Sequence, residues 1–141
     1  EPMMEAAVSS PLTMTATDGY IKNGRGHPRT SGSYSRVFGH FVRESGVISL
    51  MDAIRKATLM PAQRLESLAP AFKKKGRVSV GADADLMIFD SDRVIDRSTY
   101  QEPTLAPEGI PHVLVNGISV VRNGDSVEGV MPGKGIRAPH A

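Results

Sequence analysis

Residues 14–44 read MTATDGYIKNGRGHPRTSGSYSRVFGHFVRE. A short apolar and β-branched run ends in a single aspartate, Asp18, and a glycine-rich loop follows over residues 19–33. From Tyr34 onward, apolar residues recur at helical spacing. The loop is longer than the usual connection of about 4–6 residues, and long loops in compact domains often carry function. This stretch therefore predicts either a plain surface connection or one edge of an active site.

The sequence on either side of this loop predicts one strand and three helices. Residues 12–17 have the composition of a strand that starts after Pro11. One apolar face at helical spacing marks the first helix: Val37, Phe38, Phe41 and Val42. Gly46 should end it, and Ser49 should cap a second helix. That helix presents Leu50, Ala53, Ile54 and Ala57 on one face. Pro61 predicts a third short helix over residues 62–68.

The second half of the sequence predicts β-structure. Residues 77–81 indicate a short extended piece and a turn, and residues 85–90 indicate a strand covered on both faces. Residues 112–121 predict a hairpin whose Asn116-Gly117 pair favours a type I′ turn. A further turn is expected at Asn123-Gly124.

The element order divides the chain into two predicted parts, residues 1–75 and residues 76–141. The first is α/β and the second is β. One strand and a few amphipathic helices offer too little surface to close a core. We therefore expect the chain to complete a larger body.

Composition restricts the classes of function. The 141 residues include no cysteine, which excludes disulfides, cysteine-ligated zinc and a thiol nucleophile. The net charge of +2 is too small to favour nucleic acid, and we interpret the basic run at residues 73–77 as a solvated loop. No run approaches the ~20 apolar residues that cross a bilayer, and no signal peptide is visible. We expect a cytoplasmic protein with no membrane or nucleic-acid partner.

Several motifs of known chemistry do not occur. The sequence contains no GxxxxGK[ST] loop, no GxGxxG, no HExxH and no HxH. The four histidines are far apart: His27, His40, His112 and His140. We therefore do not expect this chain alone to form a zinc site.

Three residues of the loop are candidates for a site. Asp18 follows a predicted strand, where a carboxylate can bind metal or carry a proton, but an ordinary Asp-Gly turn would look the same. His27 could contact a ligand or substrate, or simply hold its own loop. Arg29 could clamp a carboxylate with its planar fork, or it could be an exposed arginine without a role.

The sequence resembles N-acyl-D-amino-acid deacylases of the metal-dependent amidohydrolase superfamily. The more specific matches are TDG at residues 17–19, HPR at 27–29, GSYSRVFG at 32–39 and VRE at 42–44. The match continues through DAIRKAT at 52–58, PAQR at 61–64, GADADLMIFD at 81–90, GI at 109–110 and VNG at 115–117. The resemblance runs from about residue 12 to residue 121.

The resemblance implies a fold and a reaction. Residues 1–75 would supply the last strand, the active-site loop and the C-terminal helices of a (β/α)₈ barrel. Residues 76–141 would supply C-terminal strands of a small β-sandwich and a tail. Asp18 would be the catalytic proton carrier beside zinc and a candidate zinc ligand, while His27 and Arg29 would bind the substrate. The reaction would hydrolyse an N-acyl-D-amino acid.

The resemblance also implies what this chain does not supply. The metal histidines of such enzymes lie upstream of the segment that it matches. The expected partner is therefore the rest of an amidohydrolase polypeptide or a second copy, and the chain alone should be inactive. The alternative is a non-catalytic binding or dimerisation module derived from an amidohydrolase, with its open sheet edges paired to a second copy.

Overall fold

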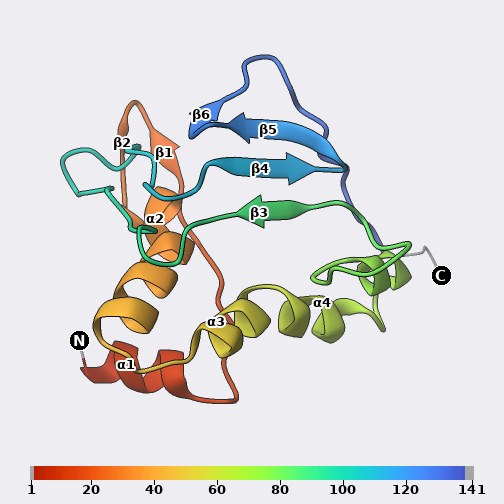
Figure 1. The fold of residues 1–141 in the computed structure, drawn as a ribbon, viewed down its shortest axis with the longest axis horizontal. Coiled ribbons are helices and arrows are strands. Elements are labelled where there is room, and N and C mark those ends of the chain that lie inside the picture. Colours follow the sequence, from red (N-terminus) through yellow and green to blue (C-terminus); the bar gives the residue numbers. More distant parts are fainter. Residues whose placement is uncertain (1, 139–141) are drawn as a thin grey trace.

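The computed structural model describes residues 2–138. Its helices are α1 (Pro2–Ser9), α2 (Arg29–Arg36), the π-helix η1 (Val37–Glu44), α3 (Leu50–Ala57), α4 (Leu59–Leu65) and the 3₁₀-helix η2 (Pro70–Lys74). Its strands are β1 (Ile21–Lys22), β2 (Arg25–Gly26), β3 (Leu86–Ile88), β4 (His112–Val115), β5 (Ile118–Arg122) and β6 (Asp125–Ser126). The sheet β3–β4–β5–β6 lies over α3 and α4, and α2 rises beside it toward the β1–β2 hairpin (Figure 1). No helix among residues 2–138 has the length and apolar content needed to cross a bilayer.

The helices follow the predicted faces but not always the predicted ends. The helix expected from Tyr34 begins earlier, at Arg29, and continues as a π-helix to Glu44. Gly46 ends it in a left-handed conformation (φ 64°), as predicted. The hydroxyl of Ser49 accepts a hydrogen bond from the Asp52 N–H at 3.1 Å, which confirms the predicted cap of α3.

The third helix starts earlier than the sequence predicts. We expected it to open at Pro61, but α4 begins at Leu59, so Pro61 lies within its first turn. A proline is tolerated there because the first-turn N–H groups have no partner inside the helix. Compared with the predicted span of residues 62–68, both ends of the helix lie three residues earlier, and the helix itself is confirmed.

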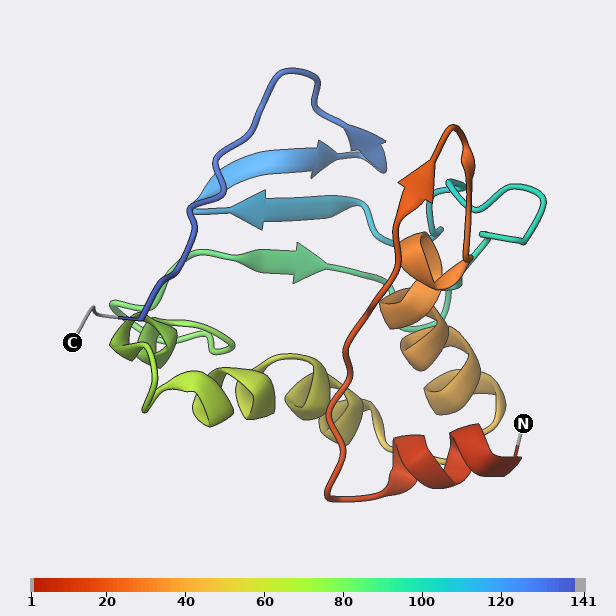
Figure 2. The same cartoon turned by 180° about the vertical axis from the view of Figure 1, so that it is seen from behind.

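The predicted strand at residues 12–17 pairs with no other strand of the described chain. Residues 13–20 run without regular structure from α1 to β1, along the outside of the molecule in Figure 2. Within the described chain, one backbone hydrogen bond connects this segment to a helix: the Thr15 N–H donates to the Lys56 carbonyl at 3.1 Å. A β-strand needs a neighbouring strand to hydrogen-bond with, and residues 2–138 place no strand beside this segment.

The sheet confirms the predicted hairpin and shows why it forms. Asn116 and Gly117 have φ values of 49° and 76°, which is the pair of positive values that a type I′ turn requires. Asn123 and Gly124, at 55° and 91°, connect β5 to β6 in the same way. Every strand pair in the described chain is antiparallel.

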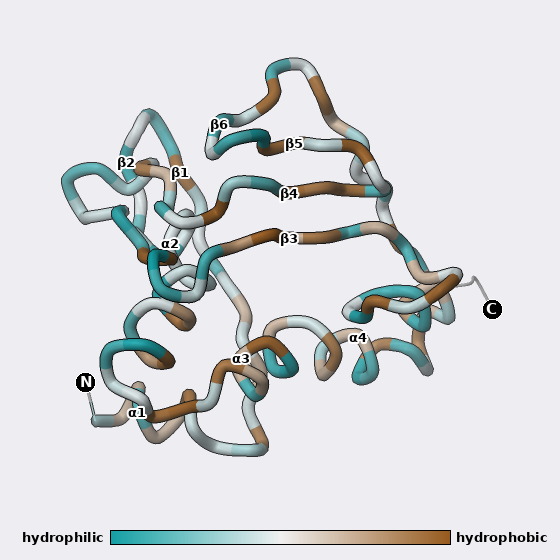
Figure 3. The backbone as a smooth tube through the Cα atoms, in the orientation of Figure 1, coloured by the Kyte–Doolittle hydropathy of each residue, from teal (hydrophilic) through white to brown (hydrophobic). Residues whose placement is uncertain are grey.

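Two predictions for the β-region hold only in part within this chain. Residues 80–81 form the expected turn, but residues 77–81 form no strand, and Val78 and Val80 are 90% and 108% exposed. The strand at β3 is not covered on both faces, because Ile88 is 51% exposed. In both places apolar side chains lack the neighbour that their sequence pattern predicts. Figure 3 shows that β3 and part of β4 consist of apolar residues.

One core crosses the predicted boundary between residues 75 and 76. Phe38 and Phe41 of η1 pack with Ala53 of α3 and with Val94, which is fully buried. The ring of Phe38 stacks on that of Phe89, just after β3, with centroids 4.9 Å apart. The division into residues 1–75 and 76–141 stays a prediction, but the two parts share this core.

Two glycines let the chain after β3 lie directly against the helix α2–η1. A Cβ atom on Gly39 would lie 2.6 Å from the Val94 carbonyl oxygen, and one on Gly32 would lie 2.5 Å from Ser98 Oγ. The same Val94 carbonyl accepts a hydrogen bond from the Arg43 guanidinium at 2.6 Å. The GSYSRVFG motif therefore shapes a packing face, on which Gly39 faces the backbone at Val94 and Gly32 faces the side chains of Ser98 and Asp96.

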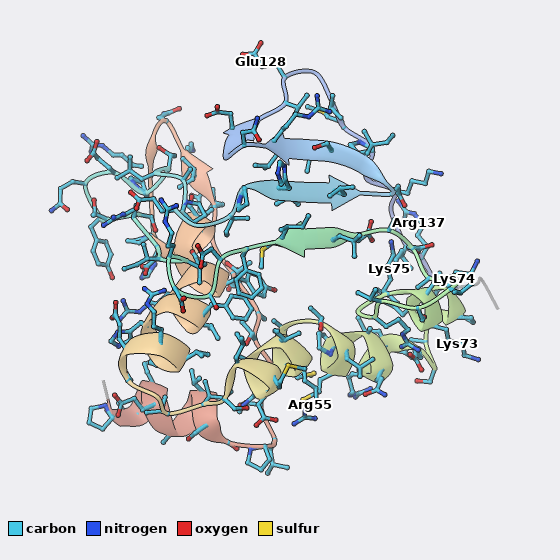
Figure 4. All side chains as sticks on the ribbon, in the orientation of Figure 1. Arg55, Lys73, Lys74, Lys75, Glu128 and Arg137 are labelled. Carbon is cyan, nitrogen blue, oxygen red and sulfur yellow. The ribbon has the colours of Figure 1, made fainter. Side chains whose placement is uncertain are left out.

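An ion-pair cluster fixes the start of the sheet. The Lys75 ammonium contacts the carboxylate of Asp85 and lies 3.1 Å from that of Asp83. Asp85 Oδ1 accepts a hydrogen bond from the Asn116 N–H at 2.8 Å, so the carboxylate holds the β4–β5 turn. In Figure 4, Lys73 and Lys74 stand at the outer edge of the molecule and Lys75 on the side toward the sheet. The basic run is thus partly solvated, as predicted, and partly structural.

Replacing Gly39 with alanine should destabilise the protein. The new methyl group meets a backbone oxygen that is itself held by Arg43, so the chain after β3 must move. Overpacking of this kind costs about 1–3 kcal/mol, offset by less than about 1 kcal/mol of improved helix propensity. Urea denaturation should show a lower midpoint for Gly39→Ala. The control is Gly133→Ala, where nothing lies within 4 Å, and equal midpoints for the two variants would contradict the packing argument.

Replacing Asp85 with asparagine should lower stability at neutral pH and matter less in acid. The Lys75 ammonium, and then the Asn116 N–H, hold the pKa of Asp85 below its usual range. A carboxylate with a lowered pKa stabilises the fold above its unfolded pKa and loses that effect as the pH falls through the folded pKa. Because a third of the side chain is exposed (34%), we expect no more than about 1 kcal/mol at pH 7.

Thermal unfolding of wild type and Asp85→Asn at pH 2–7 measures this effect. The difference in melting temperature should be constant above about pH 5 and shrink toward pH 2. Asp125→Asn, on exposed β6, is the control and should give a difference that does not change with pH. A pH-independent difference for Asp85→Asn would show that its charge is not what matters.

Candidate active-site hollow

The β1–β2 hairpin brings the ends of the glycine-rich loop together. Asn23 and Gly24 have φ values of 51° and 73°, so this Asn-Gly pair also forms a type I′ turn, which our sequence analysis did not predict. Ile21 pairs with Gly26 in the ladder. The hairpin thereby returns the chain from residue 27 onward to the side of residues 17–19.

Asp18 and Arg29 meet below this hairpin. The Nε–H of Arg29 donates to the backbone carbonyl of Asp18, and the Thr17 hydroxyl donates to the Arg29 carbonyl at 2.9 Å. The carboxylate of Asp18 is exposed, and it makes no hydrogen bond or ion pair with residues 2–138. The Arg29 side chain is also exposed, so both groups remain accessible.

Together these residues border an open hollow of about 770 Å³. It is lined by the loop and hairpin: Asp18, Gly19, Tyr20, Lys22, Asn23, Arg25, Gly26, His27 and Arg29. All three candidates predicted from the sequence therefore lie on one hollow. It offers one carboxylate, two arginines and a lysine, a set suited to holding an anionic group and moving a proton.

Gly19 is needed for packing and not for a tight turn. A Cβ atom there would lie 2.3 Å from Thr30 Oγ1 and 3.2 Å from Thr30 Cα. That hydroxyl oxygen is buried and has no hydrogen-bond partner in the described chain. Residues Asp18 and Gly19 form no turn in the structure. The ordinary Asp-Gly turn that we considered therefore does not explain why these two residues occur here.

His27 connects the hollow to a distant loop. Its Nδ1 accepts a hydrogen bond from the Arg29 N–H at 3.1 Å, at the start of α2. Its Nε2 lies 3.0 Å from the hydroxyl of Tyr100, and the two rings meet edge to face with centroids 5.1 Å apart. Sequence analysis missed Tyr100, because it is 73 residues away and belongs to no recognisable motif.

The described residues do not by themselves make a metal site. Among residues 2–138 there is no group of three or more histidine, cysteine, aspartate or glutamate side chains that could hold a metal ion. His40 lies 3.0 Å from Glu44 on η1, and His112 lies in β4. His140 lies outside the described residues. Zinc sites in proteins use three or four protein ligands, so Asp18 could supply one at most.

Sequence comparison places the chain in a known family. The profile of the amidohydrolase family matches residues 11–121. The chain belongs to the amidohydrolase family. Our predicted resemblance to N-acyl-D-amino-acid deacylases is also confirmed: the chain is 47% identical over 107 residues to an N-acyl-D-glutamate deacylase of Alcaligenes xylosoxydans xylosoxydans, with 76% of this chain and 21% of that protein covered. A D-aminoacylase of the same organism is 35% identical over 120 residues, which cover 85% of this chain and 24% of that protein.

Solved structures of related enzymes support this family assignment. A crystal structure of D-aminoacylase matches 97% of this chain with a TM-score of 0.87 and 34% identity. The N-acyl-D-glutamate deacylase of Bordetella bronchiseptica, complexed with zinc and a phosphonate inhibitor, matches 84% with a TM-score of 0.77 and 39% identity. This amidohydrolase chain spans only 28% and 24% of those chains, about a quarter of their length. The expected partial amidohydrolase fold is thus confirmed.

The purified 141-residue chain should not retain zinc. After incubation with zinc and dialysis, elemental analysis should find well below one zinc per chain, because one exposed carboxylate binds zinc weakly without further fixed ligands. The N-acyl-D-glutamate deacylase of Bordetella bronchiseptica, whose crystal structure contains zinc, is the comparison protein when treated identically. Stoichiometric zinc on the isolated chain would show that its own residues form the site.

Proposed function

We propose that this chain is the C-terminal part of a zinc-dependent amidohydrolase that hydrolyses the amide bond of N-acyl-D-amino acids. The observation that carries the proposal is the 47% identity to an N-acyl-D-glutamate deacylase over 107 residues. The amidohydrolase family match over residues 11–121 contains Asp18, His27 and Arg29. The hollow that these residues border supports it from the geometry. Activity requires the rest of the polypeptide, because the described residues form no metal site alone.

In this proposal residues 1–75 complete a (β/α)₈ barrel and residues 76–141 complete a β-sandwich. The unpaired segment at residues 13–20 takes the place of the last barrel strand, where neighbouring strands would supply its ladder. The exposed apolar residues Val78 and Val80 mark an edge of the sandwich that further strands would cover. The first feature is backbone without a neighbouring strand, and the second is exposed apolar surface. A completed fold would bury both.

Asp18 is the proposed proton carrier. Its carboxylate is accessible and has no competing partner in residues 2–138, so it is free to accept a proton from an attacking water. It would then return that proton to the leaving amine nitrogen as the amide bond breaks. In a complete enzyme, zinc held by residues of other segments would polarise the amide carbonyl, and Asp18 would face that centre.

Arg29 and His27 are the proposed substrate-binding residues. The Nε–H of Arg29 is bound to the Asp18 carbonyl, which fixes the guanidinium at the hollow and leaves its two terminal nitrogens for another acceptor. The α-carboxylate of an N-acyl amino acid fits such a fork. His27 lines the same hollow and caps the backbone of Arg29.

Asp18→Asn in the full-length polypeptide tests the proposal. The wild-type polypeptide should release free D-amino acid from N-acyl-D-glutamate, and the variant should lose at least about 100-fold in kcat, the usual contribution of a positioned acid–base group. Zinc content should stay close to wild type. Asp92→Asn, a second exposed aspartate, is the matched control and should keep wild-type kcat.

Two results would contradict this proposal. If the wild-type polypeptide hydrolysed no N-acyl-D-amino acid, the proposed reaction would be wrong. An Asp18→Asn variant with normal kcat would leave the reaction but remove Asp18 from it.

A further inference from the structure

We propose that Tyr100 is a positioning residue that holds His27, and through it Arg29, in the geometry needed at the hollow. Tyr100 does not line the hollow that contains Asp18, so it acts through His27 and not on the substrate. The inference rests on the proposed function for its kinetic consequence. Its structural part, the link from Tyr100 to His27, stands on contacts of this chain alone.

The hydrogen bonds of His27 define which ring nitrogen carries the proton. Because Nδ1 accepts from the Arg29 N–H, that nitrogen must be unprotonated. In the neutral ring the proton is therefore on Nε2, which donates to the Tyr100 hydroxyl at 3.0 Å. The Arg29 N–H thus selects this tautomer, and Tyr100 accepts the Nε2 proton and holds the plane of the ring.

The cap by His27 sets the start of helix α2. Arg29 is the first residue of that helix, and its N–H has no partner inside the helix. The ring of His27 satisfies it, so the position of the ring determines where the Arg29 main chain lies. From that main chain the Arg29 side chain reaches the Asp18 carbonyl. A displaced His27 would therefore move the guanidinium.

The loop that carries Tyr100 is anchored to the same segment at several points. The Ser98 hydroxyl donates to the Pro28 carbonyl at 2.8 Å, and the Ser31 hydroxyl donates to the Pro103 carbonyl at 2.8 Å. These bonds lie on either side of Tyr100 along the chain. They hold residues 98–103 against the start of α2, so the Tyr100 hydroxyl is presented to His27 by a fixed support and not by a free loop.

Tyr100→Phe in the full-length polypeptide separates positioning from packing. The phenyl ring keeps the edge-to-face contact and removes only the acceptor. We expect KM for N-acyl-D-glutamate to rise about three- to tenfold, the size of one lost hydrogen bond, with a smaller change in kcat. Tyr34→Phe, an exposed tyrosine outside the hollow, is the matched control and should leave both constants unchanged.

A double-mutant cycle tests whether Tyr100 acts through His27. In His27→Asn the amide oxygen can still accept from the Arg29 N–H, but the link to Tyr100 is broken. Adding Tyr100→Phe to His27→Asn should then raise KM no further. Additive effects, or an unchanged KM in Tyr100→Phe in an active enzyme, would overturn the inference while leaving the proposed function intact.

A readout independent of activity separates failure of the inference from failure of the proposed function. With ¹⁵N-labelled histidine, the ring nitrogens of His27 should show Nδ1 unprotonated and Nε2 protonated in the wild-type polypeptide, with the signal assigned by its loss in His27→Asn. Tyr100→Phe should shift both nitrogens toward a tautomer mixture, because a ring that Tyr100 no longer holds also moves away from the Arg29 N–H. Unchanged ring nitrogens in Tyr100→Phe would overturn the inference even if the polypeptide hydrolyses no substrate.

Discussion

The close contact between helix α2–η1 and the backbone of residues 94–98 is the constraint on which the rest of this structure depends. It requires hydrogen in place of a side chain at Gly32 and Gly39, since backbone or side-chain atoms occupy the space that a Cβ would need. Once the chain lies there, Val94 is buried against η1 and the loop carrying Tyr100 comes beside His27. The packing of the core and the geometry of the candidate site thus follow from one contact (Figure 1).

Local features of the fold could be predicted from the sequence, and features that need distant partners could not. The Ser49 cap and the Asn116-Gly117 turn are set by a few neighbouring residues, and both are confirmed. The segment at residues 12–17 has strand composition, but a strand also needs a neighbouring strand that residues 2–138 do not supply. The early start of α2 was missed because its N-cap residue is Pro28, and the Arg29 N–H is bound instead by the side chain of His27, which is not a usual capping residue.

The same distinction applies to the candidate site. Asp18, His27 and Arg29 were found because they lie within one short stretch of unusual composition, and the structure brings them to one hollow. Tyr100 could not be found, because nothing in the sequence around it indicates a partner 73 residues earlier. Asp18 is exposed in this chain. Backbone without a strand partner at residues 13–20 and apolar side chains such as Val80 are exposed as well, so the chain alone does not enclose Asp18.

The π-helix η1 places a limit on how this segment can vary in length. Its wider turns are seen in the bond from the Ser45 N–H to the His40 carbonyl at 2.8 Å, which spans five residues where an α-helix spans four. Deleting Phe38, between Val37 and Gly39, would turn Gly39 away from Val94 and direct a bulkier neighbour at it. Insertions and deletions accepted during evolution should therefore collect in the loops that flank η1 and spare the helix itself.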